Sequence, residues 1–312
     1  MMDIAVVGLG IIGADHLKAI EKNSNFRLVA VCDNNEERAR LFSEKYGVPY
    51  FLDYREIPVK TEAKAVIINL PHGMHCDSSI FFLRSGLNVL IEKPMANTVE
   101  ECERMLEAER VSGKKLGIGH VQRFFTANRM VKEYVDSGKL GELFAINEIR
   151  SVNYFSPDRP RWFFSKAMAG GGIVMNYGAH AFDKFLYVTG SKLKSVSASL
   201  GNIKNDSEIE GHAQFFAAFE SGVSATVTLS GYSSVGYETE YLFTEGALRV
   251  TNGRSLSILE NGVWRVAFDE PDTDFMLRQL DAFYRFIMGE SVETPDGEYG
   301  RAIIAAIEEI YK

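Results

Sequence analysis

Glycine residues with the spacing of a phosphate-binding loop lie near the start of the chain. The run Gly8-Leu9-Gly10-Ile11-Ile12-Gly13 follows an apolar segment, residues 4–7, and precedes an amphipathic one. Gly8 permits a tight turn from strand to helix, Gly10 lets the backbone approach a phosphate group, and Gly13 allows the helix to pack closely on its strand. A helix N-terminus offers free N–H groups and the positive end of the helix dipole. The run, with Ile11 and Ile12, therefore predicts a site for a dinucleotide pyrophosphate.

An acidic residue follows at the distance where such sites bind a ribose. A second strand pattern, residues 26–32, ends at Asp33, about 20 residues beyond the glycines. A carboxylate there accepts from the ribose 2′-hydroxyl and repels a 2′-phosphate, so we expect NAD in preference to NADP. Arg38 and Arg40 are close enough in sequence to keep NADP open as an alternative. The other interpretation of Asp33 is an N-cap for a helix over Glu36–Tyr46.

The composition is that of an ordinary globular protein with a cytoplasmic location. Of 312 residues, 46% are hydrophobic and 24% charged, and the net charge of −8 argues against nucleic acid or an anionic membrane as a partner. Cys32, Cys76 and Cys102 are far apart, and we interpret them as free thiols in a reducing compartment. The sequence has no apolar run of membrane-spanning length and no signal-peptide pattern.

The elements that must position these residues fall into two parts. Residues 1–120 alternate short apolar runs with helical periods, which predicts an α/β Rossmann domain with a doubly wound parallel sheet. Residues 121–312 begin with a helix, continue with eight strand patterns and close with two helices over 275–288 and 299–311. We expect NAD(P) binding from the first part. The second is expected to be a substrate-binding and oligomerisation α+β domain, whose C-terminal helix could pack back on the first.

The second part should contain a large, mainly antiparallel sheet. Asn252-Gly253 and Asn261-Gly262 are signals for type I′ hairpins. Residues 223–229 alternate apolar with hydroxyl-bearing side chains. Such a sheet could bury one face under its own helices and offer the other to a second subunit, so we expect a homodimer or homotetramer.

Two further motifs complete a set that resembles a known family. Glu92-Lys93-Pro94 ends the fifth predicted strand, and Gly170-Gly171-Gly172 is followed by Asn176, Gly178, His180 and Asp183. Together with the glycine loop and His16, these motifs make the whole chain resemble the Gfo/Idh/MocA oxidoreductase family. The resemblance implies transfer of hydride between a nicotinamide cofactor and a secondary alcohol of a sugar, cyclitol or sugar derivative.

That reaction requires a cation and a base at one carbon. The cation stabilises the developing alkoxide, and the base takes the hydroxyl proton while hydride leaves. We assign Lys93 to polarise the substrate oxygen and His180 to accept the proton, because the ordinary pKa of histidine is near neutral. The resemblance implies the same roles. The alternatives are a surface charge beside a turn for Lys93 and a hydrogen-bonded, partly buried histidine for His180. Pro94 could form a cis peptide bond with Lys93.

Asn176 departs from the family pattern, which has an aspartate four residues before the catalytic histidine. An asparagine can still bond a sugar hydroxyl or orient the imidazole, but it brings no negative charge to favour an imidazolium. Two alternative functions follow from this departure. One is a non-catalytic NAD-binding regulator, and the other is a redox-neutral, glycosidase-like enzyme that reduces and regenerates its NAD within one cycle.

Residues 69–75 carry a second departure, because His72 replaces the family's asparagine while His75 matches. We expect the nicotinamide ribose region to be lined by Asn69, Pro71, His72, His75 and Glu92. A metal reading of His72-x-x-His75-Cys76 is disfavoured, since the run passes from a strand end into a helix and has no fourth ligand. We therefore expect no metal.

Substrate contacts are expected from two places in the second part. Gln122-Arg123-Phe124 resembles the family's entry into the substrate domain. Tyr154, Arg161 and Trp162 belong to a loop with several prolines before the glycine triplet, and loops of this kind carry specificity. The alternative is that Trp162 belongs to the core.

Overall fold

The computed structural model describes residues 1–203, 207–234, 236–269, 271, 274–290 and 293–312. They form two compact units. The first comprises Met1–His120 and Met276–Ile304, and the second comprises Val121–Phe275 and Ala305–Lys312. Each unit has its own sheet.

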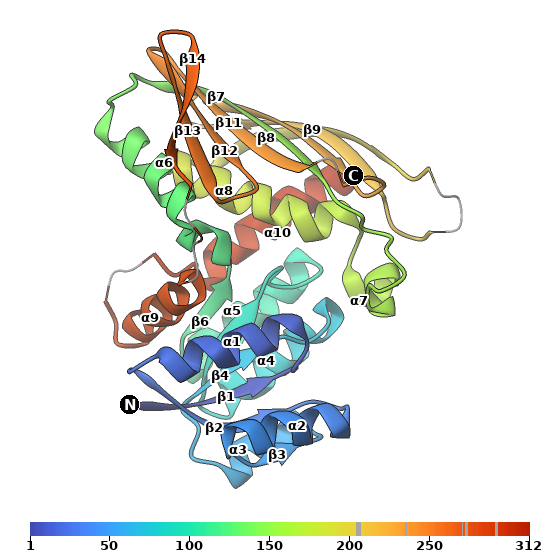
Figure 1. Cartoon of the computed structure of the whole chain (residues 1–312). Helices are drawn as coiled ribbons and strands as arrows, with labels where there is room; N and C mark the ends of the chain where they lie inside the picture. Colours follow the sequence, from blue (N-terminus) through green and yellow to red (C-terminus); the bar gives the residue numbers. More distant parts are fainter. Residues whose placement is uncertain (204–206, 235, 270, 272–273, 291–292) are drawn as a thin grey trace. The chain divides into compact units, whose positions relative to one another are not determined.

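The first unit is built on a six-stranded parallel sheet of order β3-β2-β1-β4-β5-β6 (Figure 1). All four residues of β4 and all five of β5 are buried, as expected of strands covered on both faces. The strands are β1 (Met2–Val7), β2 (Phe26–Cys32), β3 (Tyr50–Phe51), β4 (Ala65–Ile68), β5 (Asn88–Glu92) and β6 (Leu116–Gly119).

Helices connect these strands and have clear ends in the sequence. Asn35 and Thr98 cap α2 and α5 through their side chains, and Gly47 and Gly113 end the same helices in the left-handed conformation. The helical segments are α1 (Ile11–Lys22), α2 (Glu36–Tyr46), η1 (Tyr54–Glu56), α3 (Ile57–Lys60), η2 (His72–Met74), α4 (His75–Arg84), α5 (Val99–Ser112), α9 (Phe275–Ile287) and α10 (Gly297–Tyr311), of which α10 continues into the second unit.

The second unit contains an eight-stranded sheet of order β14-β13-β12-β11-β7-β10-β9-β8, in which β7 and β10 are parallel and the other neighbours antiparallel. All eight predicted strands are present. They are β7 (Leu143–Ser151), β8 (Leu193–Gly201), β9 (His212–Phe219), β10 (Ser224–Ser230), β11 (Gly236–Phe243), β12 (Gly246–Thr251), β13 (Ser255–Glu260) and β14 (Val263–Phe268). Both Asn-Gly hairpins are confirmed, because all four residues have positive φ.

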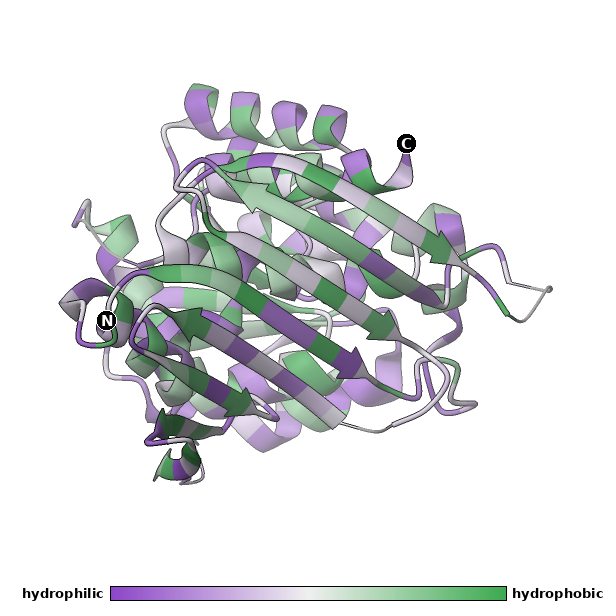
Figure 2. Ribbon diagram, turned by 90° about the horizontal axis from the view of Figure 1, so that it is seen from above, coloured by the Kyte–Doolittle hydropathy of each residue, from purple (hydrophilic) through white to green (hydrophobic). Residues whose placement is uncertain are grey.

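The sheet has one face toward the unit's helices and one away from them, and Figure 2 shows the face away from them. On the inner face Ile146, Glu148 and Tyr241 are buried, whereas on the outer face Ile149 is 58% and Phe216 45% exposed. The helical segments are η3 (Val121–Phe124), α6 (Thr126–Ser137), η4 (Arg161–Phe164), α7 (Lys166–Ala169), the π-helix η5 (Val174–Gly178) and α8 (Ala179–Thr189).

The sequence patterns did not predict α8. His180, Asp183 and Lys184 are polar but buried, so they interrupt the apolar stripe that marks an amphipathic helix. The prediction of free thiols is confirmed for Cys32, Cys76 and Cys102, all of which are buried. Burial raises the pKa of Cys32 to about 12 and that of Cys76 to about 11. Among the described residues, no helix is both long and apolar enough to span a membrane.

Candidate active site

The glycine loop contains two glycines at which a side chain would clash with the fold and one, Gly10, at which it would not. A Cβ at Gly8, whose φ is +83°, would lie 2.5 Å from the carbonyl oxygen of Asn69, and a Cβ at Gly13 would lie 2.0 Å from that of Gly8. A Cβ at Gly10 would meet nothing within 4 Å. Gly8 and Gly13 thus serve packing inside the unit, whereas the space beside Gly10 is available to a ligand.

The start of α1 is suited to an anion. It has no side-chain cap and no acidic residue in its first turn, whereas α2 and α5 have both. Ile11 is 81% and Ile12 42% exposed, so no bulky neighbour covers them. Uncapped N–H groups and a positive dipole end at an open glycine are what a pyrophosphate requires. The residues present therefore fit a dinucleotide.

Asp33 is tied to the glycine loop. Its Oδ2 accepts a 2.8 Å hydrogen bond from Leu9 N, and its Oδ1 accepts one of 2.8 Å from Asn35 N. Arg38 Nη1 lies 3.2 Å from Oδ2. Because Asn35 caps α2, the interpretation of Asp33 as its N-cap is wrong. The carboxylate is 6% exposed at the end of β2, the position that meets a ribose in Rossmann folds.

A buried pair fixes the end of β5 beneath Lys93. His16 Nε2 on α1 lies 3.0 Å from Glu92 Oε1, and the other carboxylate oxygen accepts a 3.3 Å bond from Lys93 N. The expected cis peptide between Lys93 and Pro94 is present. The sequence placed His16 in the glycine motif without a role, and the structure gives it one as a partner of Glu92.

The segment after β4 is held by backbone carbonyls. His75 has its two ring nitrogens 2.8 Å from the carbonyl oxygens of Pro94 and Leu70, and burial lowers its pKa. The neutral imidazole has one N–H, so it donates to one of these two carbonyls. Asn69 donates to the carbonyl oxygens of Val7 and Gly8 at 3.3 Å each, the carbonyl of Pro71 accepts from Met74 N at the start of η2, and His72 is buried. No group of three or more potential metal ligands occurs among the described residues.

In the second unit, Glu210 and Tyr311 occupy the space that side chains at Gly171 and Gly172 would need. A Cβ at Gly171 would lie 2.0 Å from the Tyr311 hydroxyl, and one at Gly172 would lie 2.0 Å from the Glu210 carbonyl oxygen. The Glu210 carboxylate accepts from Gly172 N at 2.9 Å, Val174 N at 2.8 Å and the Tyr311 hydroxyl at 2.8 Å. These bonds fix the start of η5, and sequence reasoning missed both Glu210 and Tyr311.

η5 and α8 carry Asn176 and His180, which are 6% and 7% exposed. The Tyr177 ring lies between them in sequence, with its centroid 6.3 Å from that of His180. Tyr154 is fully buried, and burial raises its pKa while the Asn176 amide acts in the opposite direction. The Tyr154 side chain therefore packs inside the unit, and its contact with substrate stays a prediction.

Two buried ion pairs anchor α8. Arg123 on η3 pairs with Asp183, and Lys184 pairs with Glu148 on β7. All four side chains are at most 6% exposed. Arg123 is thus engaged with α8, and the neighbouring Gln122 is also buried. Through Asp183, Arg123 contacts the middle of the helix that bears His180.

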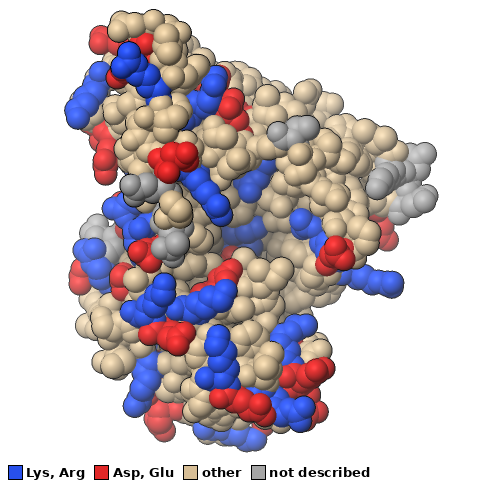
Figure 3. Space-filling model, in the orientation of Figure 1, with Lys and Arg blue, Asp and Glu red and all other residues tan. Residues whose placement is uncertain are grey.

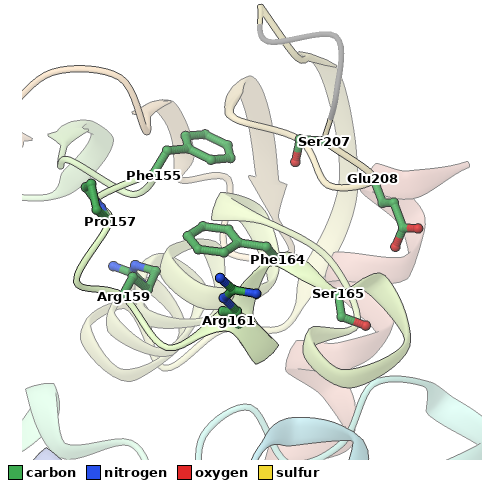
Figure 4. Close-up of a pocket in the computed structure, with 8 residues that line it drawn as sticks. All are labelled: Phe155, Pro157, Arg159, Arg161, Phe164, Ser165, Ser207 and Glu208. Carbon is green, nitrogen blue, oxygen red and sulfur yellow. The ribbon is translucent and has the colours of Figure 1, made fainter.

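The loop before the glycine triplet borders a pocket of about 920 Å³. Figure 4 shows its two arginines below two phenyl rings, with the polar side chains of Ser165, Ser207 and Glu208 on the other side. Trp162 is half-buried and stacks on Phe163 at 3.7 Å, whereas Arg161 is exposed and lines the pocket. The lining residues are Phe155, Pro157, Arg159, Arg161, Phe164, Ser165, Ser207 and Glu208.

The face of the molecule shown in Figure 3 has no large patch of a single charge. Basic and acidic side chains alternate across it. The net charge of −8 is therefore not concentrated on that face.

The first unit is a Rossmann fold with a glycine loop, which defines a class of dinucleotide-binding proteins. A family model described as an oxidoreductase family with an NAD-binding Rossmann fold matches residues 2–120, and the model of the C-terminal domain of the same family matches residues 128–249. The chain belongs to this Gfo/Idh/MocA family of oxidoreductases, and its predicted fold class and NAD cofactor are confirmed.

The individual relatives share between 24% and 31% sequence identity with this chain. A 1-carboxy-3-chloro-3,4-dihydroxycyclohexa-1,5-diene dehydrogenase of Comamonas testosteroni is 31% identical over 74% of this chain, and the match spans 58% of that protein. A D-glucoside 3-dehydrogenase of Escherichia coli is 24% identical over 99% of this chain and 94% of its own length. An aldose-aldose oxidoreductase from Caulobacter crescentus has a TM-score of 0.90 at 24% identity, covering 99% and 96% of the two chains, which shows the shared fold.

Proposed function

We propose that the protein is an NAD-dependent dehydrogenase that acts on a secondary alcohol of a ring-shaped polyhydroxylated substrate, a sugar, cyclitol or sugar derivative. The observation that carries the proposal is the uncapped start of α1 beside the open Gly10, in a chain of this oxidoreductase family. The names of its relatives agree, because each describes oxidation of a hydroxylated ring or an aldose.

The roles assigned to individual residues form part of the proposal. Residues 1–120 would bind NAD, and residues 121–312 the substrate. Lys93 donates to the substrate oxygen and stabilises negative charge on it, and His180 accepts the hydroxyl proton. Asn176 orients the substrate or the imidazole by hydrogen bonding, in the place of a charged aspartate. NAD, when bound, supplies the hydride acceptor.

The cofactor preference rests on Asp33. Its carboxylate lies at the end of β2, where a Rossmann fold places the ribose, and would repel a 2′-phosphate, which favours NAD. Arg38 at 3.2 Å partly offsets that repulsion, so NADP is the alternative. Rates with both cofactors at equal concentration decide between them.

The test begins with NADH formation, followed by absorbance, across a panel of cyclitols, aldoses and their derivatives. Lys93→Met should then lower kcat by about a hundredfold to a thousandfold while the Kd for NAD stays unchanged, because only transition-state stabilisation is lost. Lys22→Met, at an exposed lysine in the last turn of α1, is the matched control. A Lys93→Met protein as fast as the wild type would refute the assignment.

The alternatives predict different results in the same assay. A regulator that has lost turnover binds NAD and produces no NADH with any alcohol. A redox-neutral enzyme retains NAD through purification and converts a glycoside without net release of NADH.

We propose further that the outer face of the eight-stranded sheet is the contact between copies in a homodimer or homotetramer. Ile149, Phe216 and Val266 are 58%, 45% and 65% exposed on its strands, and apolar surface of this kind is often covered by a partner. Sedimentation of a monomer at micromolar concentration would contradict this. The three free thiols agree with a cytoplasmic location.

A further inference from the structure

Arg150 stands out among the cations inside the second unit. It lies on β7 directly opposite Tyr237 of β11, on the face of the sheet that meets α8. Its guanidinium carbon is 4.3 Å from the centroid of the Tyr177 ring and 4.5 Å from that of Tyr237. Nε and Nη1 of Arg150 are buried and have no hydrogen-bond partner. The guanidinium is thus held between two aromatic faces while two of its nitrogens remain unsatisfied.

Two buried cations near Arg150 each have an anionic partner. Arg123 pairs with Asp183, and Lys184 pairs with Glu148 and also donates to Thr239 at 2.9 Å. Asp183 on α8 and Glu148, two residues before Arg150 on β7, are therefore already paired. Arg150 is half-buried, and its two buried nitrogens have lost their hydration without gaining a hydrogen-bond acceptor, which is unfavourable.

A second arginine reaches the same tyrosine. Arg159 Nη2 lies 3.5 Å from the Tyr177 hydroxyl, and its guanidinium stacks 4.1 Å from the Tyr154 centroid. Arg159 also lines the pocket of Figure 4. No ion pair joins Arg150 or Arg159 to a carboxylate in the part of the chain that the structure describes.

This pair of arginines lies close to the proposed base. Both contact Tyr177, and the Tyr177 ring centroid is 6.3 Å from that of His180. Glu148, the nearest acid on the strand of Arg150, is already engaged by Lys184. Tyr177 therefore contacts two guanidinium groups beside the residue that would take the substrate proton, and the carboxylate of Glu208 lines the same pocket as Arg159.

We propose that Arg150, with Arg159, binds a carboxylate of the substrate beside His180, so that the substrate is a ring alcohol that also carries a carboxylate. The proposal rests on the proposed dehydrogenase function and narrows its substrate class. A carboxylate supplies two acceptor oxygens in one plane, which match the planar donor edge of a guanidinium held in place by stacking. The binding would neutralise the unpaired charge.

The experiment compares acids with neutral sugars of the same ring. Calorimetry of the full chain, with and without NAD, gives Kd values for D-glucuronate against D-glucose and D-galacturonate against D-galactose, with quinate and shikimate as cyclic acids. We expect at least one acid to bind about tenfold to a hundredfold more tightly than the neutral sugars, the range that a charge-assisted hydrogen bond supplies. No preference for any acid over the neutral sugars overturns the proposal.

Variants of Arg150 test whether the preference for acids over neutral sugars depends on this residue. Arg150→Gln should abolish it, and Arg150→Lys should restore part of it by returning the charge without the planar fork. Arg249→Gln is the matched control, because Arg249 also stacks on an aromatic ring, Trp264 at 4.1 Å, but is paired with Glu240 at 2.6 Å. If Arg150→Gln does not fold, Arg150→Lys and Arg159→Gln carry the test. A preference unchanged in the folded variants overturns the assignment.

The two proposals fail in different ways. Oxidation of neutral alcohols with no preference for acids removes the carboxylate site and leaves the dehydrogenase. Binding of acids that depends on Arg150, without NADH from any substrate, keeps the site and removes the dehydrogenase.

Discussion

Gly10 and Gly13 belong to one loop, yet alanine at Gly13 should lower stability, whereas alanine at Gly10 should lower the affinity for NAD. At Gly13 the new Cβ would lie 2.0 Å from the carbonyl oxygen of Gly8, where van der Waals contact requires about 3.4 Å. Either α1 or the Gly8 carbonyl must move by more than about 1 Å. Gly10→Ala introduces no such overlap, because nothing lies within 4 Å of its Cβ.

The magnitudes follow from these distances. Overpacking of a rigid site costs about 1–3 kcal/mol, more than the gain of about 0.5–1 kcal/mol from replacing a helical glycine. Gly13→Ala should therefore lower Tm by several degrees. Gly10 has extended backbone with φ −67°, which alanine adopts freely. Gly10→Ala should keep its stability within about 1 kcal/mol and lose about tenfold to a hundredfold in NAD affinity, because the methyl group occupies the space through which the backbone approaches phosphate.

Two measurements on each variant separate the effects. Thermal unfolding without ligand reports packing, and calorimetric titration with NAD at a temperature where both variants are folded reports binding. A Gly10→Ala protein that binds NAD as tightly as the wild type would refute the placement of the pyrophosphate at this loop. A Gly13→Ala protein with an unchanged Tm would show that the loop relaxes at no cost, contrary to the packing argument.

Two further predictions concern buried polar groups. Burial lowers the pKa of His75, so below about pH 6.5 the unfolded chain takes up a proton that the folded chain does not. The free energy of unfolding should therefore fall by up to about 1.4 kcal/mol per pH unit. In urea unfolding between pH 7 and 5, His75→Gln should show a shallower decline of this free energy than the wild type, and an equal slope would contradict the prediction. Lys184→Met leaves Glu148 buried without its cation and should cost about 3–5 kcal/mol in urea unfolding. The double variant with Glu148→Leu should recover most of that loss, and a double variant no more stable than the single one would count against the pairing argument.

Local patterns were enough to predict the parts of the fold that are governed by local physics. The eight strands of the second sheet show period-2 alternation or turn residues such as Asn252-Gly253, and both signals depend only on neighbouring residues. The glycine loop was likewise predictable, because φ and close approach at Gly8 and Gly13 restrict the residue type.

The parts that were missed depend on contacts between distant residues. α8 buries Asp183 and Lys184, which pair with Arg123 and Glu148 from other elements, so its own sequence does not show an apolar stripe. The same holds for Tyr311, whose hydroxyl bonds to Glu210 101 positions earlier in the chain. The pairing of Arg123 with Asp183 likewise joins residues 60 positions apart, and the expected contact of Arg123 with substrate stays a prediction.

The π-helix at Val174–Gly178 also has a consequence for how the protein could change during evolution. A π-turn contains one residue more than the α-turn it replaces. Loss of a single residue from this segment would close the wide turn into an ordinary α-turn and shorten the spacing in sequence between Asn176 and His180. The side chains here can be exchanged one at a time, as Asn176 shows by its departure from the family's aspartate. A change in the number of residues would alter where Asn176 and His180 lie relative to each other around the helix axis, so the arrangement of this pair depends on the length of the segment as well as on its side chains.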